Sequence, residues 1–380
     1  MKIVSQILLI ALFFSLFGCA NIKQDSLREV VRSANPKIKK VIAKANEYEV
    51  QIIYTQILRD KNNHVKFKDY TYHLNANNYF YPASTVKFPI ALLALEKLNT
   101  IDNTSVNTEY EIEGNPNKLQ FSAEITKVFA VSDNEASTNL FEFIGFDYLN
   151  ESMIAKGLPS FRFSHRLSGA DSRNLQTKPI RLYKEDNTIV DFPTFQNKAL
   201  VRLKLNKLQK GIGYMKGNTL ENSLFDFSTK NYYSLETLHN TMKRIIFPES
   251  FKEKERFHIK EKDREFILFS MQNLPKNAGY NPIEYYDSYG KFFMFGDSKD
   301  LIPSSIKIYN KIGQAYGTLT DCAYIVDAEN KIEFMVSATI LVNKNQIFND
   351  DTYEYEEIGL PFLAELGRQL YDKNKKNKAN

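Results

Sequence analysis

The chain has 380 residues, of which 43% are hydrophobic and 25% are charged, an ordinary globular composition. This length allows two domains, although large mixed folds often form only one. The net charge of +5 comes from Lys2 and from four lysines in residues 373–380, so the body of the chain is neutral. Without a basic excess, nucleic-acid binding is not expected.

The first 18 residues have the pattern of a secretory signal peptide. Lys2 precedes an uncharged, mostly apolar stretch over residues 3–17, and small residues follow it. That stretch is short for a membrane span, which needs about 20 apolar residues. Residues 16–19 (LFGC) resemble the lipobox of bacterial lipoproteins. The resemblance implies cleavage before Cys19 and its lipidation, hence an anchor in the bacterial envelope on the periplasmic side. The alternative is an ordinary signal peptide with an unrelated cysteine nearby.

The folded domain is expected over residues 36–372. Residues 19–35 are mostly polar and are predicted to be a spacer between the anchor and this domain. The basic tail, residues 373–380, is predicted to be solvated and disordered, with weak attraction to anionic lipid as an alternative. With Cys19 lipidated, Cys322 has no partner for an internal disulfide, and we expect it to be buried in a strand.

Strands are predicted near both ends of the domain, with helices between them. A short amphipathic helix precedes a hairpin with strands near residues 50–55 and 65–74. The C-terminal part predicts strands near residues 306–313, 321–327 and 332–342, and then a helix over residues 358–371. The helices between are predicted at residues 84–98, 124–131, 135–144, 235–246 and 261–271. This order predicts an α+β fold in which an antiparallel sheet, built from both termini, packs against a mainly helical part.

Residues 82–89 (PASTVKFP) place a serine three positions before a lysine, at the start of a helix that is apolar all round and therefore buried. Positions i and i+3 share one helix face, so the amine of Lys87 can lie beside the hydroxyl of Ser84. A serine hydroxyl is a weak nucleophile until a base takes its proton. Burial lowers the pKa of a lysine and allows it to be that base. Alone, the pattern also fits a helix-capping serine with a surface lysine.

A second pattern, Ser132-Asp133-Asn134, separates two predicted helices. In a catalytic interpretation, Ser132 relays a proton, Asn134 hydrogen-bonds the substrate and Asp133 holds the turn. Because these residue types are also preferred helix N-caps, a simple cap is the alternative.

A third pattern, Lys311-Ile312-Gly313, lies on a predicted strand near the C-terminus. A cation here suits a substrate carboxylate, and glycine lets the backbone approach a ligand closely. The alternative is an edge-strand lysine followed by a turn glycine.

Together, these three patterns resemble the S-x-x-K, S-D-N and K-T-G elements of class A β-lactamases and penicillin-binding proteins, in the same order and structural contexts. The resemblance extends from about residue 48 to about residue 371. It implies that Ser84 attacks an amide carbonyl and becomes acylated, with Lys87 as the base. Ser132 would pass the proton to the leaving nitrogen.

The resemblance also implies how the substrate is held. Backbone N–H groups of Ser84 and Gln314 would form an oxyanion hole, in which each donor is typically worth about 3–4 kcal/mol. Lys311 would attract the substrate carboxylate, and Asn134 and Gly313 would contact the substrate. No metal or cofactor is implied.

Two positions depart from the family pattern. Ile312 stands where the family has threonine or serine, and the loss of a hydrogen bond to a charged group costs about 1.5–3 kcal/mol. The family's deacylating glutamate is also missing, because Asp171 is the only carboxylate between Glu151 and Glu185. Asp171 is the expected substitute. His165 is a second candidate base, although a structural role suits it better.

The leading hypothesis is therefore a monomeric serine hydrolase that cleaves β-lactams. The missing glutamate favours the alternative of a D,D-peptidase or a slowly deacylating penicillin-binding protein that acts on cell-wall peptides. A third hypothesis, a non-catalytic binding or sensor domain, is disfavoured by the intact Ser84, Lys87, Ser132 and Lys311. Residues 178–231 are predicted to be an insertion near the mouth of the site.

Overall fold

The computed structural model describes residues 25–167, 169 and 171–379. The predicted signal peptide and Cys19 lie outside this range. No helix in the described part of the chain has the length and apolar character of a membrane span.

A five-stranded antiparallel sheet forms the centre of the molecule, with the strand order β13-β14-β15-β1-β2. Its strands are β1 (Gln51–Arg59), β2 (Val65–Tyr72), β13 (Ile306–Ala315), β14 (Thr318–Asp327) and β15 (Ile332–Leu341). Because β1 pairs with β15, the N-terminal hairpin and the three C-terminal strands form one sheet, which confirms the predicted fold class. Cys322 is buried on β14, as expected.

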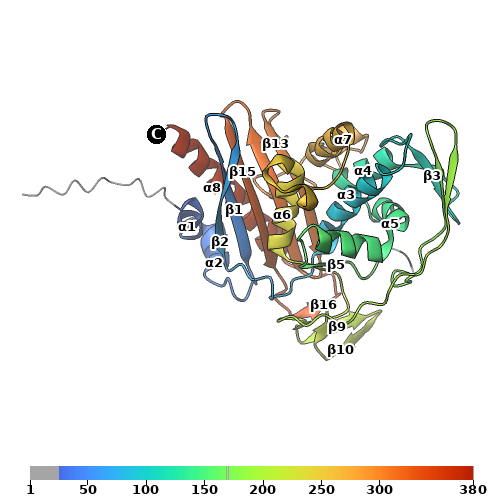
Figure 1. Ribbon diagram of the computed structural model, residues 1–380. Helices are drawn as coiled ribbons and strands as arrows, with labels where there is room; N and C mark the ends of the chain where they lie inside the picture. Colours follow the sequence, from blue (N-terminus) through green and yellow to red (C-terminus); the bar gives the residue numbers. More distant parts are fainter. Residues whose placement is uncertain (1–24, 168, 170, 380) are drawn as a thin grey trace, which may run out of the picture.

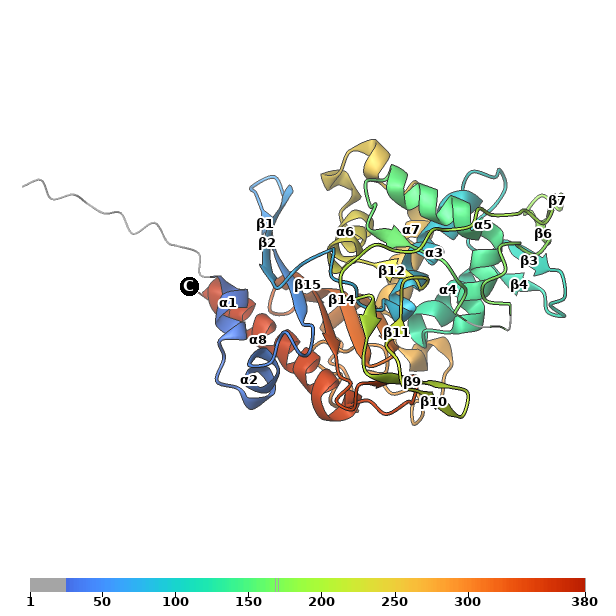
Figure 2. The same ribbon diagram turned by 90° about the horizontal axis from the view of Figure 1, so that it is seen from below.

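Helices cover both faces of this sheet (Figure 1). One face packs against α1 (Ser26–Val31), α2 (Pro36–Ile42) and α8 (Leu360–Ala379), which lie side by side in Figures 1 and 2. The other face packs against α6 (Leu235–Ile246). Beyond it lie α3 (Lys87–Leu98), α4 (Phe121–Ala130), α5 (Asn134–Ala155, kinked at Gly145) and α7 (Glu261–Gln272). Each side has its own apolar core.

Helix α3 is buried all round, as its sequence predicts, and Lys97 is its only residue that is not buried. A helix enclosed in this way has little freedom to shift, so the residues at its first turn are held firmly.

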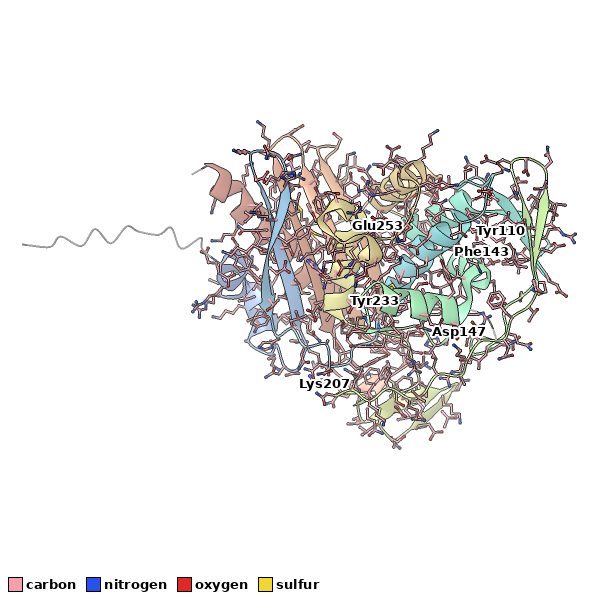
Figure 3. The ribbon with its side chains drawn as sticks, viewed as in Figure 1. Tyr110, Phe143, Asp147, Lys207, Tyr233 and Glu253 are labelled. Atoms are coloured by element: carbon pink, nitrogen blue, oxygen red, sulfur yellow. The ribbon has the colours of Figure 1, made fainter. Side chains whose placement is uncertain are left out.

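Short strands lie at the edges of the helical part. At its far edge, β3 (Glu109–Ile112), β4 (Leu119–Gln120), β6 (Ile180–Tyr183) and β7 (Ile189–Phe192) form a four-stranded sheet. Figure 3 shows Tyr110 and Phe143 where this sheet meets the helices; both rings pack against Phe121, at 4.5 and 5.2 Å between centroids. Single-turn helices occur at Ala83–Val86 (η1), Pro248–Ser250 (η2), Glu253–Glu255 (η3), Pro275–Ala278 (η4) and Tyr355–Gly359 (η5).

The predicted insertion, residues 178–231, supplies β6 and β7 and a second group of short strands below the sheet (Figure 1). That group comprises β8 (Gln209–Lys210), β9 (Gly213–Lys216), β10 (Thr219–Glu221) and β11 (Phe225–Asp226), and β16 (Ile347–Phe348) pairs with β9. Strand β12 (Tyr232–Tyr233) pairs with β5 (Phe161–Arg162). Lys207, labelled in Figure 3, and Lys210 both pair with Glu49 and tie the insertion to the sheet.

The structure corrects two predicted boundaries at the ends of the domain. The described part of the predicted spacer contains α1, whose Leu27 and Val30 are buried, because even this short segment has an apolar face. The basic tail is helical to Ala379 rather than disordered, since no proline or glycine interrupts α8 in this tail. Lys373 in this tail pairs with Glu29 on α1.

Candidate active site

Ser84 lies in η1, the tight turn that leads into α3. The turn is fixed by Thr85, whose hydroxyl and backbone N–H both donate to the Pro82 carbonyl oxygen, at 2.7 and 3.1 Å. Ala83 adopts a φ of 46°, a left-handed conformation that costs energy for a residue with a Cβ and that concentrates at functional sites. Ser84 is half-buried, and no described residue hydrogen-bonds its hydroxyl. The hydroxyl is therefore available to a ligand.

Lys87 begins α3, and its side chain is fully buried. Its amine donates to Asn134 Oδ1 at 2.6 Å and to the Ser132 carbonyl oxygen, with Ser132 Oγ at 3.4 Å. It forms no ion pair within the part of the chain that the structure describes. Burial lowers the pKa of Lys87 to about 7, although the Asp133 carboxylate acts to raise it. At neutral pH, about half of this amine is therefore unprotonated and able to accept a proton.

The Ser132-Asp133-Asn134 turn is brought against Lys87, as the sequence pattern predicts. Asp133 is the N-cap of α5 and accepts from Ala136 N at 2.8 Å, so it holds the turn. Ser132 adopts a φ of 59°, which turns the chain sharply between α4 and α5. Its hydroxyl accepts from Lys311 Nζ at 2.7 Å, so a chain of polar contacts runs from Lys87 through Ser132 to Lys311.

Lys311 and Gly313 lie on β13, on the side of the strand that faces the helices. Lys311 is buried, and its amine also donates to the Ile312 carbonyl oxygen at 3.0 Å. Burial and the nearby Lys87 lower its pKa well below the ordinary range. A Cβ on Gly313 would lie 2.5 Å from the Pro82 carbonyl oxygen, so only glycine lets β13 pack this closely against the Ser84 turn.

A second buried polar cluster supports β13 from behind. Lys291 donates to Asn310 Oδ1 at 2.7 Å, and Asn310 Nδ2 donates to Asp321 at 2.9 Å. Asp321 also accepts from two backbone N–H groups. Burial lowers the pKa of Lys291 to about 7 and raises the pKa of Asp321 to about 6. These bonds hold the strand that carries Lys311.

A cleft of about 580 Å³ opens over Ser84. Its lining comes from η1, from β13 and its turn, and from the segment before η5, with two further residues from the helical part. The lining residues are Tyr81, Ala83, Ser84, Asn134, Leu167, Gln314, Ala315, Tyr316, Asn349, Asp351, Tyr353 and Tyr355. Gln314 therefore shares the cleft with Ser84, where the oxyanion-hole hypothesis needs it, while Lys87 and Lys311 lie buried behind the wall.

Comparison with known proteins supports this fold. A family model described as the beta-lactamase enzyme family matches residues 33–191, which include Ser84, Lys87 and Ser132 but not β13. A solved beta-lactamase from Burkholderia vietnamiensis is 11% identical with a TM-score of 0.50, over 92% of this chain and 96% of that one. This chain has the β-lactamase/transpeptidase-like serine hydrolase fold.

A structure of L2 complexed with relebactam is similar to the same extent, with 10% identity and a TM-score of 0.50 over 92% of this chain and 99% of that one. No curated protein sequence matches the chain. Identities this low establish the fold and leave the substrate open.

Ile312, the departure from the family's third motif, is a core residue in this serine hydrolase fold. Its side chain is 9% exposed and belongs to the apolar core that also contains Phe292, Phe293 and Leu319. The position therefore contributes packing, and an isoleucine there has a structural reason.

Asp171 lies at a different cavity from Ser84. It is exposed and lines a polar cavity together with Glu135 and Glu142. Arg166 holds the surrounding loop by pairing with Glu142 at 2.6 Å and by donating to the Gln176 carbonyl oxygen at 2.8 Å. A deacylating role for Asp171 stays a prediction, and this arrangement does not favour it.

His165 is held as a structural residue. Its Nδ1 bonds the Arg166 carbonyl oxygen at 2.9 Å, and its backbone N–H donates to Asn231. Its pKa is lowered to about 4, mainly by burial and in smaller part by the charges of Lys230, Arg173 and Arg162. Nε2 is buried and has no partner among the described residues.

Sequence reasoning missed part of the cleft. Asn349, Asp351, Tyr353 and Tyr355 come from an irregular segment with no motif, and no local pattern connects it to Ser84. The count of 22 tyrosines was the only available signal, and it does not say where they gather.

Proposed function

We propose that this protein is a serine hydrolase that forms an acyl-enzyme at Ser84 and hydrolyses β-lactams. The observation that carries the proposal is the arrangement around Lys87. A buried amine with a pKa near 7 lies one helical turn from the half-exposed Ser84 and contacts Ser132, which also accepts from Lys311. Within this fold, such an arrangement suits transfer of the Ser84 hydroxyl proton to Lys87 and delivery of a proton to the leaving amide nitrogen.

In the proposed reaction, Ser84 Oγ bonds to the amide carbonyl carbon while its proton passes to neutral Lys87. The carbonyl oxygen becomes an oxyanion that accepts from the backbone N–H groups of Ser84 and Gln314. The proton then moves through the Ser132 hydroxyl to the leaving nitrogen as the amide bond breaks. The contacts among Lys87, Ser132 and Lys311 support this route.

A second candidate function has its own support, from the missing deacylation base. Asp171 lines another cavity, and Asp351 is the only carboxylate that lines the Ser84 cleft within the described residues. A cleft in which no carboxylate activates water for attack on the acyl group would release that group slowly. A penicillin-binding protein or D,D-peptidase acting on cell-wall peptides is therefore the alternative.

Time-resolved intact mass of the protein with excess benzylpenicillin tests both candidates, with Ser84→Ala as the control. An adduct that decays while penicillin is consumed supports the β-lactamase. An adduct that persists supports the penicillin-binding protein. If neither protein forms an adduct and penicillin stays intact, the proposal is wrong.

We further propose that the mature protein is anchored by lipid on Cys19, on the periplasmic side of the envelope. The sequence LFGC at residues 16–19 supports this. Fractionation of cells that express wild-type and Cys19→Ser protein tests it. The variant should leave the membrane fraction, and retention there would contradict the proposal.

A further inference from the structure

The predicted insertion carries a small sheet with an apolar outer face. Strand β9 lies between β10 and β16, and the registers place Met215 opposite Leu220 and Gly213 opposite Ile347. Successive residues of a strand point to opposite faces, so these four residues share one face. The opposite face carries Tyr214 and packs on a separate aromatic cluster. Met215, Leu220 and Ile347 therefore point away from the body of the protein, and we call them the outer face.

The outer face is open to solvent. Leu220 is 46% exposed, and Met215 and Ile347 are half-buried. A Cβ on Gly213 would lie 3.1 Å from Ile347 Cδ1 and 3.2 Å from Leu220 Cδ1, so the glycine lets these two side chains close into one apolar surface. Ile212 directly precedes β9 and is 60% exposed. Apolar side chains that gather on a surface, unlike single ones, mark a site of contact.

The segment that carries most of this face is basic. Residues 192–220 contain six lysines and arginines and no carboxylate. Exposed apolar side chains also concentrate there, since five of the eleven large ones in the described part of the chain lie within residues 200–224. Basic and exposed apolar residues together are the composition of elements that lie in the interface of an anionic bilayer.

A cavity of about 410 Å³ brings further lysines to the same place. Its charged lining residues are Lys44, Lys207, Lys210, Lys344, Glu47 and Glu49. Lys344 forms no ion pair with any described residue. The pair between Lys44 and Glu47 is more than half exposed on both sides and is therefore weak. With four lysines against two glutamates, this lysine cavity attracts an anion.

The lysine cavity adjoins the outer face. Gly211 and Phe348 line the cavity, and they are the chain neighbours of Ile212 and Ile347. Helix α2, which directly precedes Lys44, and the β9–β10 hairpin both lie in the lower half of Figure 1 and of Figure 2. One flat surface can therefore touch both.

The proposed anchor would bring such a surface close. Ser26, the first residue of α1, is seven positions after Cys19. Seven residues span at most about 25 Å, so a lipid on Cys19 would hold the domain against the membrane.

We propose that this side of the protein docks on an anionic lipid surface. The outer face enters the apolar edge of the leaflet, and the lysine cavity takes a lipid phosphate. A second copy of the chain is a poorer occupant, because two cationic faces repel each other. Salt screens the attraction, so docking alone is too weak to keep the Cys19→Ser protein in a cell membrane fraction.

Fluorescence of the unlipidated Cys19→Ser protein tests the outer face. The chain has no tryptophan, so Leu220→Trp adds a single fluorophore. With vesicles of phosphatidylglycerol and phosphatidylethanolamine at low salt, we expect its emission to shift to the blue and to be quenched by lipids with brominated acyl chains. Ile154→Trp, at a 55% exposed position on α5, is the matched control and should show neither effect.

Vesicle flotation tests the lysine cavity. Lys44→Gln combined with Lys344→Gln should weaken binding about twentyfold, since each basic residue near an anionic leaflet contributes about fivefold. Lys66→Gln combined with Lys262→Gln changes two exposed lysines elsewhere and should leave binding unchanged. Vesicles of phosphatidylcholine alone should not bind.

The inference is overturned if the anionic vesicles do not bind, if they quench both tryptophan variants equally, or if binding ignores the two cavity lysines. A blue-shifted Leu220→Trp emission without lipid, in a dimer that sedimentation detects, would make a second copy the occupant and would also overturn it. These measurements do not involve Ser84, so they are independent of the proposed hydrolysis.

Discussion

Acylation of Ser84 should rise with pH through a midpoint near the pKa of Lys87. Burial lowers that pKa from 10.5 to about 7. Only the neutral amine accepts a proton, so the rate should grow about tenfold per pH unit below the midpoint and level off above it. At pH 7 about half of the Lys87 side chains are neutral. With the ordinary pKa, roughly one in three thousand would be neutral, so burial increases the neutral fraction by about a thousandfold.

Two substitutions should move this midpoint in opposite directions. Asp133→Asn removes the carboxylate that raises the pKa of Lys87 but keeps an acceptor for Ala136 N, so the midpoint should fall. Asn134→Asp places a carboxylate 2.6 Å from the Lys87 amine and should raise the midpoint by roughly one to three units.

The assay is the second-order rate of adduct formation with benzylpenicillin, followed by intact mass from about pH 5 to about pH 10. Lys87→Met is the control and should lose the pH-dependent rate. A flat profile in the wild-type protein, or a midpoint above about 9, would refute Lys87 as the base. If neither Asp133→Asn nor Asn134→Asp shifts the midpoint of the pH–rate profile, nearby charges do not control the pKa of Lys87.

Three further predictions follow from the packing around the site. Gly313→Ala should slow acylation about a hundredfold or more, because a Cβ would lie 2.5 Å from the Pro82 carbonyl oxygen and would push the oxyanion-hole donors apart. The variant should keep a native circular dichroism spectrum. An unchanged acylation rate would contradict the close packing of β13 against the Ser84 turn. Arg166→Ala should lower the free energy of unfolding in urea by about 3–5 kcal/mol, since it leaves the buried Glu142 carboxylate unpaired. Ile312→Thr should lower the free energy of unfolding by about 1–3 kcal/mol in the same measurement, because its hydroxyl would be buried in the apolar core.

The parts of the site that could be predicted from the sequence are those set by local spacing. Ser84 and Lys87 are one helical turn apart, and the apolar run that follows them predicts a buried helix; the structure confirms both. Asp133 is a helix N-cap by residue type alone. The hairpin and the C-terminal strands were predictable because their alternation and turns are local.

The parts that could not be predicted depend on long-range packing. Asp171 was singled out by elimination along the loop, but the pairing of Arg166 with Glu142, 24 residues apart, decides where the loop lies. Likewise Lys230 lies beside Tyr316, 86 residues away, only because the predicted insertion packs against the turn that carries Tyr316. No periodicity in the sequence encodes such contacts.

The way the buried lysines are held explains why this site can do base chemistry at neutral pH. Lys243, a buried lysine elsewhere in the fold, pairs with Asp69 at 2.7 Å. Burial still lowers the pKa of Lys243, but the pairing opposes that effect. Lys87 instead donates to an amide oxygen and a carbonyl oxygen. Neutral oxygens stabilise the positive charge of the amine less than a carboxylate would, so desolvation dominates and the pKa falls. An ion pair would stabilise the fold and hold Lys87 protonated, and the site gives up that stability for a usable base.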